Sequence, residues 1–320
     1  MRIAVVGAGA LGLYYGAMLQ RGGGKVAFLL RRDYEAISAH GLQVSSVNGD
    51  FHLPHVAGYR QTTDIGPVDL VLIGLKTFAN DQIQELIPPL LGEQTLLLTL
   101  QNGLGNEDLL AGLFGSQRVL GGVAFLCANR GEPGVVHHLG AGRIELGAWG
   151  DVPVGRLASV AAAFVAAGIE CRVVADVRRA RWQKLVWNIP FNGLCALLDQ
   201  PVDRLLRFPA TRRLIREIML EVIGAANLQD LSEPIADAFA EQMLVFTDAM
   251  GPYLPSMLID RREGRPLELD AIFAAAVSAG AERGAALPRT STVHALLSFA
   301  VDSGVAADTL LLKKEAHVAG

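Results

Sequence analysis

The chain has 320 residues, of which 51% are hydrophobic and 19% charged, and its formal net charge is −4 at pH 7. This composition indicates large buried cores rather than disorder, and the length predicts two domains. The slightly negative charge argues against a nucleic-acid partner, which normally requires a basic face, and no apolar run approaches the ~20 residues that span a membrane.

The strand predicted over 2–6 runs directly into Gly7-Ala8-Gly9-Ala10-Leu11-Gly12, which opens a helix predicted over 10–21. This is the G-x-G-x-x-G fingerprint of dinucleotide-binding folds in its required strand–turn–helix context. Gly7 permits the tight turn, Gly9 lets the backbone approach a pyrophosphate, and Gly12 allows close packing of helix and strand. The helix N-terminus then offers N–H groups to the phosphates. A turn without a ligand is the weaker interpretation, because the whole context is present.

Arg31 and Arg32 follow the second predicted strand, where NAD-specific folds carry an acidic residue for the ribose 2′-hydroxyl. A guanidinium group matches a 2′-phosphate instead. The alternative is a solvated arginine pair at a strand end. The position favours NADPH/NADP+ as the cofactor, with Arg31 as the residue that reads the phosphate.

Short apolar runs alternate with helical patterns in the first half of the chain, which is typical of a parallel α/β sheet. Polar and apolar residues alternate over 42–56 about Asn48-Gly49, which predicts a hairpin. The other predicted strands cover 26–30, 70–75, 95–100, 119–124, 135–146 (antiparallel) and 170–174, and the other predicted helices cover 34–39, 80–87, 107–113 and 154–167.

The pattern changes after Asp176, where long helical periodicities and few β-branched runs begin. We therefore predict a Rossmann-type α/β domain over 1–176 that binds NADP, followed by an all-α substrate and catalytic domain over 177–320. Arginine clusters at 178–181 and 261–265 are expected to form solvated faces near helix starts. The tail after Leu312 is expected to be frayed.

Cysteine use and the start of the chain bear on its compartment. Cys127, Cys171 and Cys195 lack C-x-x-C spacing, so we expect reduced thiols and no metal site. The first predicted strand begins at residue 2, which leaves no room for a signal peptide. We therefore expect a cytoplasmic protein.

Lys184, Asn188 and Asn192 lie at i, i+4 and i+8 of a predicted helix. At about 100° per residue, eight steps drift by only ~80°, so the three polar groups share one face. Their neighbours are apolar, and a lysine with two amides in so apolar a helix needs polar partners. A purely structural polar stripe is the weaker alternative, because asparagine is a mediocre helix former.

Taken together, these features resemble the ketopantoate reductase (2-dehydropantoate 2-reductase) family along essentially the whole chain. The resemblance implies a Rossmann-type domain followed by an all-α domain. It also implies NADPH-dependent reduction of 2-dehydropantoate, a small 2-oxo acid, to pantoate in pantothenate and coenzyme A biosynthesis. Beyond the glycine motif and Arg31, the matching segments are Leu75-Lys76, Gln101-Asn102-Gly103, Lys184-Leu185-Val186-Trp187-Asn188 with Asn192, Pro255-Ser256-Met257 and Leu267-Glu268-Leu269-Asp270.

By this resemblance Lys184 would be the general acid and Glu268 would orient it. An ammonium can stabilise the charge that develops on the ketone oxygen and donate the proton, and partial burial would lower its pKa. The substrate would be bound by Asn102, Lys184, Asn188, Asn192 and Ser256. The cofactor would be bound by Gly7, Ala8, Gly9, Ala10, Leu11, Gly12, Arg31, Lys76, Asn102, Ala128 and Glu268.

Structural explanations compete with some of these roles. Ser256 is equally consistent with a helix N-cap, and Glu268 with a first-turn acid that complements a helix dipole. His137 and His138 have no third ligand at metal spacing, so we expect them to be structural.

Val202 departs from the family pattern, which commonly has a substrate-facing asparagine directly after a proline. Asp199 or Asp203 would have to compensate, unless the substrate lacks that hydroxyl. The alternatives are therefore a paralogous NADPH-dependent reductase of another small 2-oxo acid, or a non-catalytic NADPH sensor, which would not need the Lys184 face. The helical region also carries enough apolar surface for a homodimer.

Overall fold

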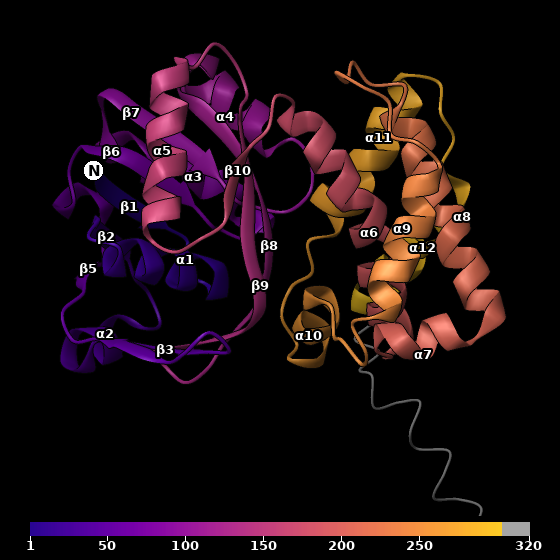
Figure 1. Cartoon of the computed structure of the whole chain (residues 1–320), viewed down its shortest axis with the longest axis horizontal. Helices are drawn as coiled ribbons and strands as arrows, with labels where there is room; N and C mark the ends of the chain where they lie inside the picture. Colours follow the sequence, from indigo (N-terminus) through magenta and orange to yellow (C-terminus); the bar gives the residue numbers. More distant parts are fainter. Residues whose placement is uncertain (303–320) are drawn as a thin grey trace, which may run out of the picture. The chain divides into compact units, whose positions relative to one another are not determined.

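The computed structural model describes residues 1–302, so the tail after Leu312 lies outside the described residues. The chain divides into two compact units, Met1–Ala180 and Arg181–Gly320. The first unit holds the strands and the second is helical (Figure 1).

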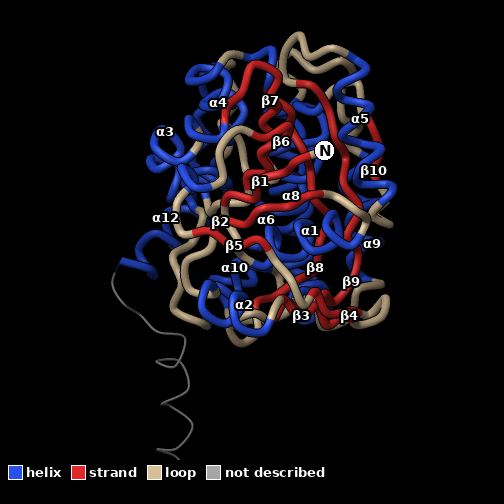
Figure 2. Tube along the Cα trace, turned by 90° about the vertical axis from the view of Figure 1, so that its left-hand side faces the viewer, coloured by secondary structure: helices blue, strands red, loops and turns tan. Residues whose placement is uncertain are grey.

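The first unit is built on one ten-stranded sheet. The parallel part consists of β1 (Arg2–Val6), β2 (Lys25–Leu29), β5 (Ala57–Tyr59), β6 (Val68–Ile73), β7 (Leu91–Thr99) and β8 (Val119–Arg130). In space their order is β5-β2-β1-β6-β7-β8, which Figure 2 shows as successive strands from β5 to β7. This is the 3-2-1-4-5-6 order of dinucleotide-binding folds, which bind their ligand where the order reverses. The reversal lies between β1 and β6.

Further strands extend the sheet beyond β8 and make it mixed. The long β9 (Val135–Ala148) pairs antiparallel with β8, and β10 (Cys171–Val173) pairs parallel with β9. β3 (Leu42–Ser46) pairs parallel with the first residues of β9 and antiparallel with β4 (Phe51–Leu53). The hairpin predicted about Gly49 is therefore confirmed, and so is the antiparallel strand predicted after residue 135.

Helices cover both faces of the parallel strands. Ile3 and Val5 of β1 belong to the apolar cluster that includes α1 and α5, while Ala4 and Val6 belong to the cluster that includes α3 and α4. A strand buried on both faces needs an unbroken apolar run, which β1 has. The helices are α1 (Ala10–Arg21), α2 (Tyr34–His40), α3 (Ile83–Leu86), α4 (Asn106–Phe114) and α5 (Val154–Ala166).

The helix predicted over 80–87 differs from the structure. A 3-10 turn, η2 (Thr77–Gln82), precedes the short α3. Ala79 leaves the helical region inside η2, with φ −105° and ψ 15°. Pro88 and Pro89 lack the N–H groups that would continue α3. The residue pattern over 80–87 therefore predicted a longer helix than the structure has, because the backbone leaves helical geometry at Ala79 and the prolines end α3.

All regular elements among the described residues of the second unit are helices, as predicted. α6 crosses the division between the units, and its part from Arg181 onward belongs here. The helices are α6 (Val177–Leu198), α7 (Val202–Arg207), α8 (Pro209–Ala226), α9 (Ala238–Asp248), α10 (Ser256–Arg262), the π-helical turn η5 (Asp270–Ala274), α11 (Ala275–Glu282) and α12 (Pro288–Asp302).

α6 packs closely against several of these helices. Trp187 donates from its indole Nε1 to Thr247 Oγ1 of α9 at 2.9 Å. A Cβ on Gly193 would lie 2.7 Å from Val293 Cγ1 of α12 and 3.0 Å from the Phe273 ring of η5. Glycine at this position therefore allows the backbone of α6 to approach both neighbours.

The two arginine clusters are exposed at Arg178, Arg262 and Arg265, as predicted, but not throughout. Arg181 is only 2% exposed. Arg261 donates to the carbonyl oxygens of Ala196 and Leu197 at the end of α6. The last carbonyls of a helix have no intrahelical partners, so Arg261 completes the hydrogen bonding of α6. The prediction of solvated faces was wrong for these two residues, because a run of arginines does not show which groups lie nearby.

None of the three cysteines forms a disulfide; Cys195 is buried, and Cys127 and Cys171 are half-buried. Burial raises the pKa of the Cys171 thiol to about 11 and raises that of Cys195 further. Both thiols are therefore protonated at neutral pH. Within residues 1–302, no group of three or more metal-ligating side chains is placed to hold an ion. None of the described helices is both long and apolar enough to cross a membrane.

Candidate functional site

The glycine motif lies at the carboxyl end of β1, next to the loop that follows β6. Gly7 has a φ of +100°, and a Cβ there would lie 2.2 Å from the backbone nitrogen of Leu75. A Cβ on Gly12 would lie 2.1 Å from the carbonyl oxygen of Gly7. The Gly74 N–H also donates to the Val6 carbonyl at 2.8 Å. The two loops therefore touch through backbone atoms, and neither glycine can be replaced without moving them.

Gly9 differs from the other two glycines. Its backbone is extended, with φ −77° and ψ −169°, and a Cβ there would meet nothing within 4 Å. Gly9 is the N-cap of α1, whose first N–H groups have no intrahelical partners. Open space before a helix N-terminus fits a pyrophosphate. The turn thus suits a dinucleotide, and the predicted contacts Ala8, Ala10 and Leu11 belong to the same turn.

Lys76 and Asn102 reach the same edge of the sheet. Lys76 follows β6 and is half-buried, and Asn102 follows β7 and is also half-buried. Because β1, β6 and β7 are parallel neighbours, their carboxyl ends lie together. The structure therefore groups the glycine turn, Lys76 and Asn102 at the position where the strand order reverses.

A buried chain of amides joins the loops of Lys76 and Asn102. Gln101 Nε2 donates to Asn80 Oδ1 at 2.7 Å, and Asn80 Nδ2 donates to Asn106 Oδ1 at 3.0 Å. Asn106 Nδ2 then donates to the Asn102 carbonyl at 2.9 Å. Buried amides hold their neighbours firmly once they are paired. Sequence reasoning missed Asn80 and Asn106, since no local pattern marks side chains that pair between η2 and the connection from β7 into α4.

Arg31 is exposed in the turn after β2. Its Nη2 donates to Oε1 of Gln82, the last residue of η2. The amide oxygen of Gln82 orients the guanidinium group and leaves its charge in place. Gln82 was also missed by sequence reasoning. Ala128 lies in β8 opposite His138.

His138 has a structural role, as expected. It is buried, its Nε2 donates to the Ala141 carbonyl at 3.0 Å, and its Nδ1 lies 2.8 Å from Ser46 Oγ. Its ring stacks on Tyr14 with centroids 4.4 Å apart. These contacts tie β3, β9 and α1 together.

In the second unit, Lys184, Asn188 and Asn192 share a face of α6, with Lys184 half-buried and both asparagines buried. Asn192 Oδ1 accepts the Met257 N–H at 3.2 Å. This bond joins the face to the start of α10, where Ser256 lies. The structure therefore brings together two segments that are far apart in the sequence, as the predicted site requires.

Ser256 and Glu268 occupy helix starts of different kinds. Pro255 is the N-cap of α10 and Ser256 is its first residue, exposed and without a capping bond, so the N-cap explanation of Ser256 is wrong. Glu268 comes two residues before η5 and is only 5% exposed. Phe273, in η5, lies against α6 at Gly193. π-helical turns are rare and are frequently found at functional sites.

Val202 itself does not present a side-chain donor. Val202 is fully buried, and its N–H donates to the Tyr253 carbonyl at 3.1 Å. Asp199 accepts from Arg262 Nε at 2.6 Å, and Asp203 pairs with Arg207 at 3.0 Å. Each carboxylate is thus held in an ion pair.

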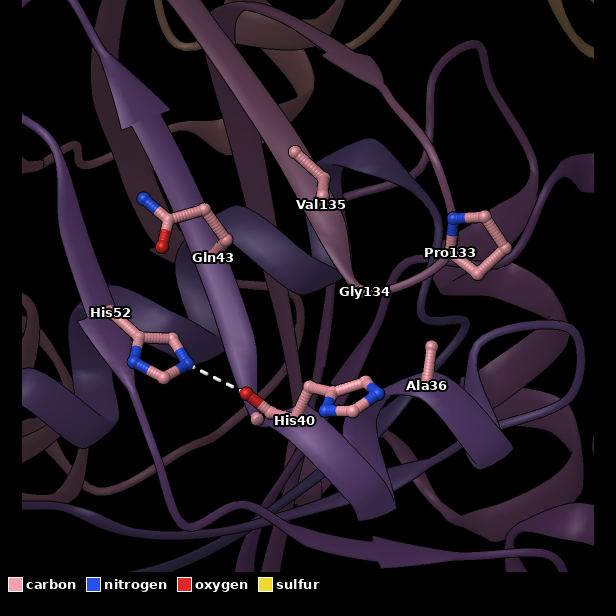
Figure 3. Close-up of a pocket in the computed structure, with 8 residues that line it drawn as sticks. Ala36, His40, Gln43, His52, Pro133, Gly134 and Val135 are labelled. Atoms are coloured by element: carbon pink, nitrogen blue, oxygen red, sulfur yellow. Dashed lines mark hydrogen bonds between the residues drawn. The ribbon is translucent and has the colours of Figure 1, made fainter.

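A separate surface pocket of about 340 Å³ lies in the first unit, and no predicted site residue lines it. Figure 3 shows the polar side chains of His40, Gln43 and His52 among those that line it, together with Pro133 and Val135. His52 Nε2 donates to the His40 carbonyl at 2.7 Å. The pocket shares Gly134 with the turn between β8 and β9.

Comparison with known proteins covers both units. Residues 3–151 match the family described as Ketopantoate reductase PanE/ApbA, and residues 176–300 match Ketopantoate reductase PanE/ApbA C terminal. A 2-dehydropantoate 2-reductase from Nostoc sp. is 40% identical over 303 residues, which are 93% of this chain and 94% of that protein.

Solved structures show the same fold. A crystal structure of 2-dehydropantoate 2-reductase from Geobacter metallireducens is 63% identical with a TM-score of 0.93, and covers 94% of this chain and 100% of that one. A D-mandelate dehydrogenase solved with NADH and anilino(oxo)acetate has a TM-score of 0.86 at 23% identity, covers 95% of this chain and 99% of that one, and shows likeness of fold alone.

The glycine geometry predicts that two alanine substitutions act differently. Gly9→Ala should fold normally but bind NADPH at least ~10-fold more weakly, because its methyl group fills the space before the helix N-terminus. Gly12→Ala should lower the free energy of unfolding by about 1–3 kcal/mol or more, because its Cβ collides with backbone. Thermal unfolding and calorimetric titration measure both effects.

The matched control is Gly112→Ala, since a Cβ on Gly112 of α4 meets nothing within 4 Å. It should leave NADPH binding unchanged and raise the free energy of unfolding by up to about 1 kcal/mol, because alanine favours a helix interior more than glycine does. A Gly9→Ala protein that binds NADPH as tightly as the parent would contradict the assignment of the turn.

Proposed function

The chain belongs to the ketopantoate reductase family, and on this premise we propose that it transfers a hydride from NADPH to the C2 ketone of 2-dehydropantoate. The product is pantoate, for pantothenate and coenzyme A synthesis. The observation that carries the proposal is the family match over both units, residues 3–151 and 176–300. The family consists of dinucleotide-dependent oxidoreductases, and NADPH is the proposed donor.

The first unit is proposed to bind the cofactor. When bound, NADPH supplies the hydride from its nicotinamide ring. The N-terminus of α1 at Gly9 binds the pyrophosphate, and Arg31 binds the 2′-phosphate. Lys76 and Asn102, at the ends of β6 and β7, bind the part of the dinucleotide that follows the pyrophosphate. The amide chain from Gln101 to Asn106 keeps the Asn102 loop in place.

The second unit is proposed to carry the acid. Hydride addition to the ketone carbon leaves negative charge on its oxygen, which needs one proton to become the product hydroxyl. The ammonium group of Lys184 stabilises that charge and delivers the proton. Glu268 is buried, and we assign it the role of orienting Lys184.

Asn188, Asn192 and Ser256 are proposed to orient the substrate. Because Asn192 Oδ1 accepts the Met257 N–H, Nδ2 is the part of this side chain that can donate to a carboxylate. Ser256 is exposed at the start of α10 and can donate from its hydroxyl group. Together they offer donors for an anionic, hydroxylated acid.

Two further expectations stay predictions. A cytoplasmic location is tested by cell fractionation, and a homodimer by light scattering of the purified chain.

The choice of substrate is tested by steady-state kinetics over a panel of 2-oxo acids. We expect the highest kcat/KM for 2-dehydropantoate, with 2-oxoisovalerate, which lacks its hydroxymethyl group, at least ~10-fold lower because a hydrogen bond to that hydroxyl is lost. Equal turnover of the two acids would favour a paralogous reductase of another 2-oxo acid. The buried Val202 motivates this alternative, because its side chain cannot donate a hydrogen bond to a substrate hydroxyl.

The acid is tested by Lys184→Ala. We expect kcat to fall by ~10²–10⁴, the usual effect of removing a general acid, while the Kd of NADPH changes little. Lys25→Ala, which removes an exposed lysine at the start of β2, is the control and should behave as the parent. Unchanged turnover in Lys184→Ala would remove Lys184 from its role.

The cofactor assignment is tested by Arg31→Ala. Losing a charge-assisted bond to the 2′-phosphate should weaken the binding of NADPH by ~10–100-fold and the binding of NADH by less than ~3-fold. The dissociation constants are measured by calorimetry, with Arg213→Ala, an exposed arginine of α8, as the control. Equal losses for both cofactors would refute the assignment.

A further inference from the structure

We propose that Arg130 is a positioning residue that determines cofactor specificity. By holding the carboxylate of Asp33 buried, away from the exposed Arg31 of the same turn, it sets the preference for NADPH over NADH. The inference rests on the proposed assignment of Arg31 to the 2′-phosphate. It concerns Asp33 and Arg130, which have no other role in the proposed mechanism.

Asp33 is an acid in an unexpected place. It follows Arg31 by two residues, at the end of the second strand, where an acidic side chain usually selects NAD by accepting the ribose 2′-hydroxyl. A carboxylate facing that ribose would repel a 2′-phosphate. An NADPH-binding chain with an acid here therefore needs a way to keep it from the ribose.

The structure shows where this carboxylate goes. The Asp33 side chain is 3% exposed, and its Oδ2 accepts from Arg130 Nη2. Its Oδ1 accepts the Gly134 N–H at 3.2 Å. Both oxygens are thus occupied, one by the last residue of β8 and one by the turn between β8 and β9. The positive charge of Arg130, whose side chain is 29% exposed, compensates the buried negative charge.

The backbone of the turn supports this arrangement. The Arg31 carbonyl accepts the Tyr34 N–H at 3.2 Å, and the Asp33 carbonyl accepts the Ile37 N–H at 2.9 Å. Arg32 Nη2 also donates to the Gly131 carbonyl at 3.0 Å. Asp33 and Arg32 therefore both fasten the turn to the β8–β9 connection. Arg31 instead is exposed and bonds to Gln82, a neutral partner that does not cancel its charge.

Removing Arg130 would take away the counter-ion of Asp33 and lower the net positive charge around the turn by one. A buried carboxylate without a counter-ion is costly, so Asp33 would turn out toward solvent. There it would pair with Arg31, two residues away, or accept the 2′-hydroxyl of NADH. Both events weaken the recognition of a 2′-phosphate, and neither weakens the recognition of NADH.

The test measures dissociation constants of NADPH and NADH by calorimetry for the parent and four variants. Arg130→Met should lower the ratio of NADPH to NADH affinity by ~10-fold or more, since like charges across a binding site are strongly unfavourable. Arg130→Lys keeps the charge and should largely keep the ratio. Asp33→Asn/Arg130→Met removes both charges and should restore the ratio to within ~3-fold of the parent.

The matched control is Arg289→Met in the second unit. Arg289 pairs with Glu221, whose side chain is 8% exposed, so this variant also leaves a buried acid without its arginine. It should lower the melting temperature without changing the cofactor ratio. If Arg130→Met does not fold, Arg130→Gln, which keeps a donor without the charge, carries the same expected loss.

The outcomes separate this inference from the proposed function. An unchanged ratio in Arg130→Met or Arg130→Gln overturns the inference, and so does an equal loss of both cofactors, which indicates a merely structural pair. Failure of the double variant to recover NADPH overturns it as well. If the parent prefers NADH, or if Arg31→Ala weakens both cofactors equally, the cofactor assignment itself fails and the inference falls with it. If Arg31→Ala lowers the preference for NADPH and Arg130→Met does not, the inference fails and the proposed function stands.

Discussion

The first unit depends on a backbone contact between the loops that follow β1 and β6. No side chain fits at Gly7 or Gly12, where a Cβ would lie 2.2 Å and 2.1 Å from backbone atoms. The contact makes α1 leave the sheet at once, so its N-terminus opens where the strand order reverses. Lys76 and Asn102 follow the adjacent strands and reach the same edge. Gly7, which has no room for a methyl group, therefore allows the glycine turn to lie against the loop that leads to Lys76.

The second unit depends on a different constraint, the burial of polar groups on α6. Burying an amide costs free energy unless it is hydrogen-bonded, and Asn192 meets this need through the Met257 N–H. The same bond fixes the start of α10 and hence Ser256. A residue that would be unfavourable in a purely apolar helix thereby becomes the link between two parts of the proposed site. Gly193, next along the helix, lets η5 pack closely enough to hold the segment that contains Glu268.

The sequence predicted most of the elements and missed most of the pairings. The strand–turn–helix at Gly7 and the common face of Lys184 and Asn192 were predictable because both depend on spacing within one segment. The prediction of solvated arginine clusters was wrong at two positions, since Arg181 is buried and Arg261 bonds to carbonyls of another helix. The N-cap alternative for Ser256 was wrong because Pro255, one residue earlier, holds that position.

The sequence by itself determined the dinucleotide turn, the polar face of α6 and the position of an arginine after the second strand. Each is a local property of the chain, set by helix and strand geometry over a few residues. Only the tertiary structure decided which partners these groups receive. Gln82 meets Arg31 from 51 residues away, and Arg130 meets Asp33 from 97 residues away. Such partners are set by strand order and by the turn between β8 and β9, because a buried charge pairs with whatever the fold places beside it.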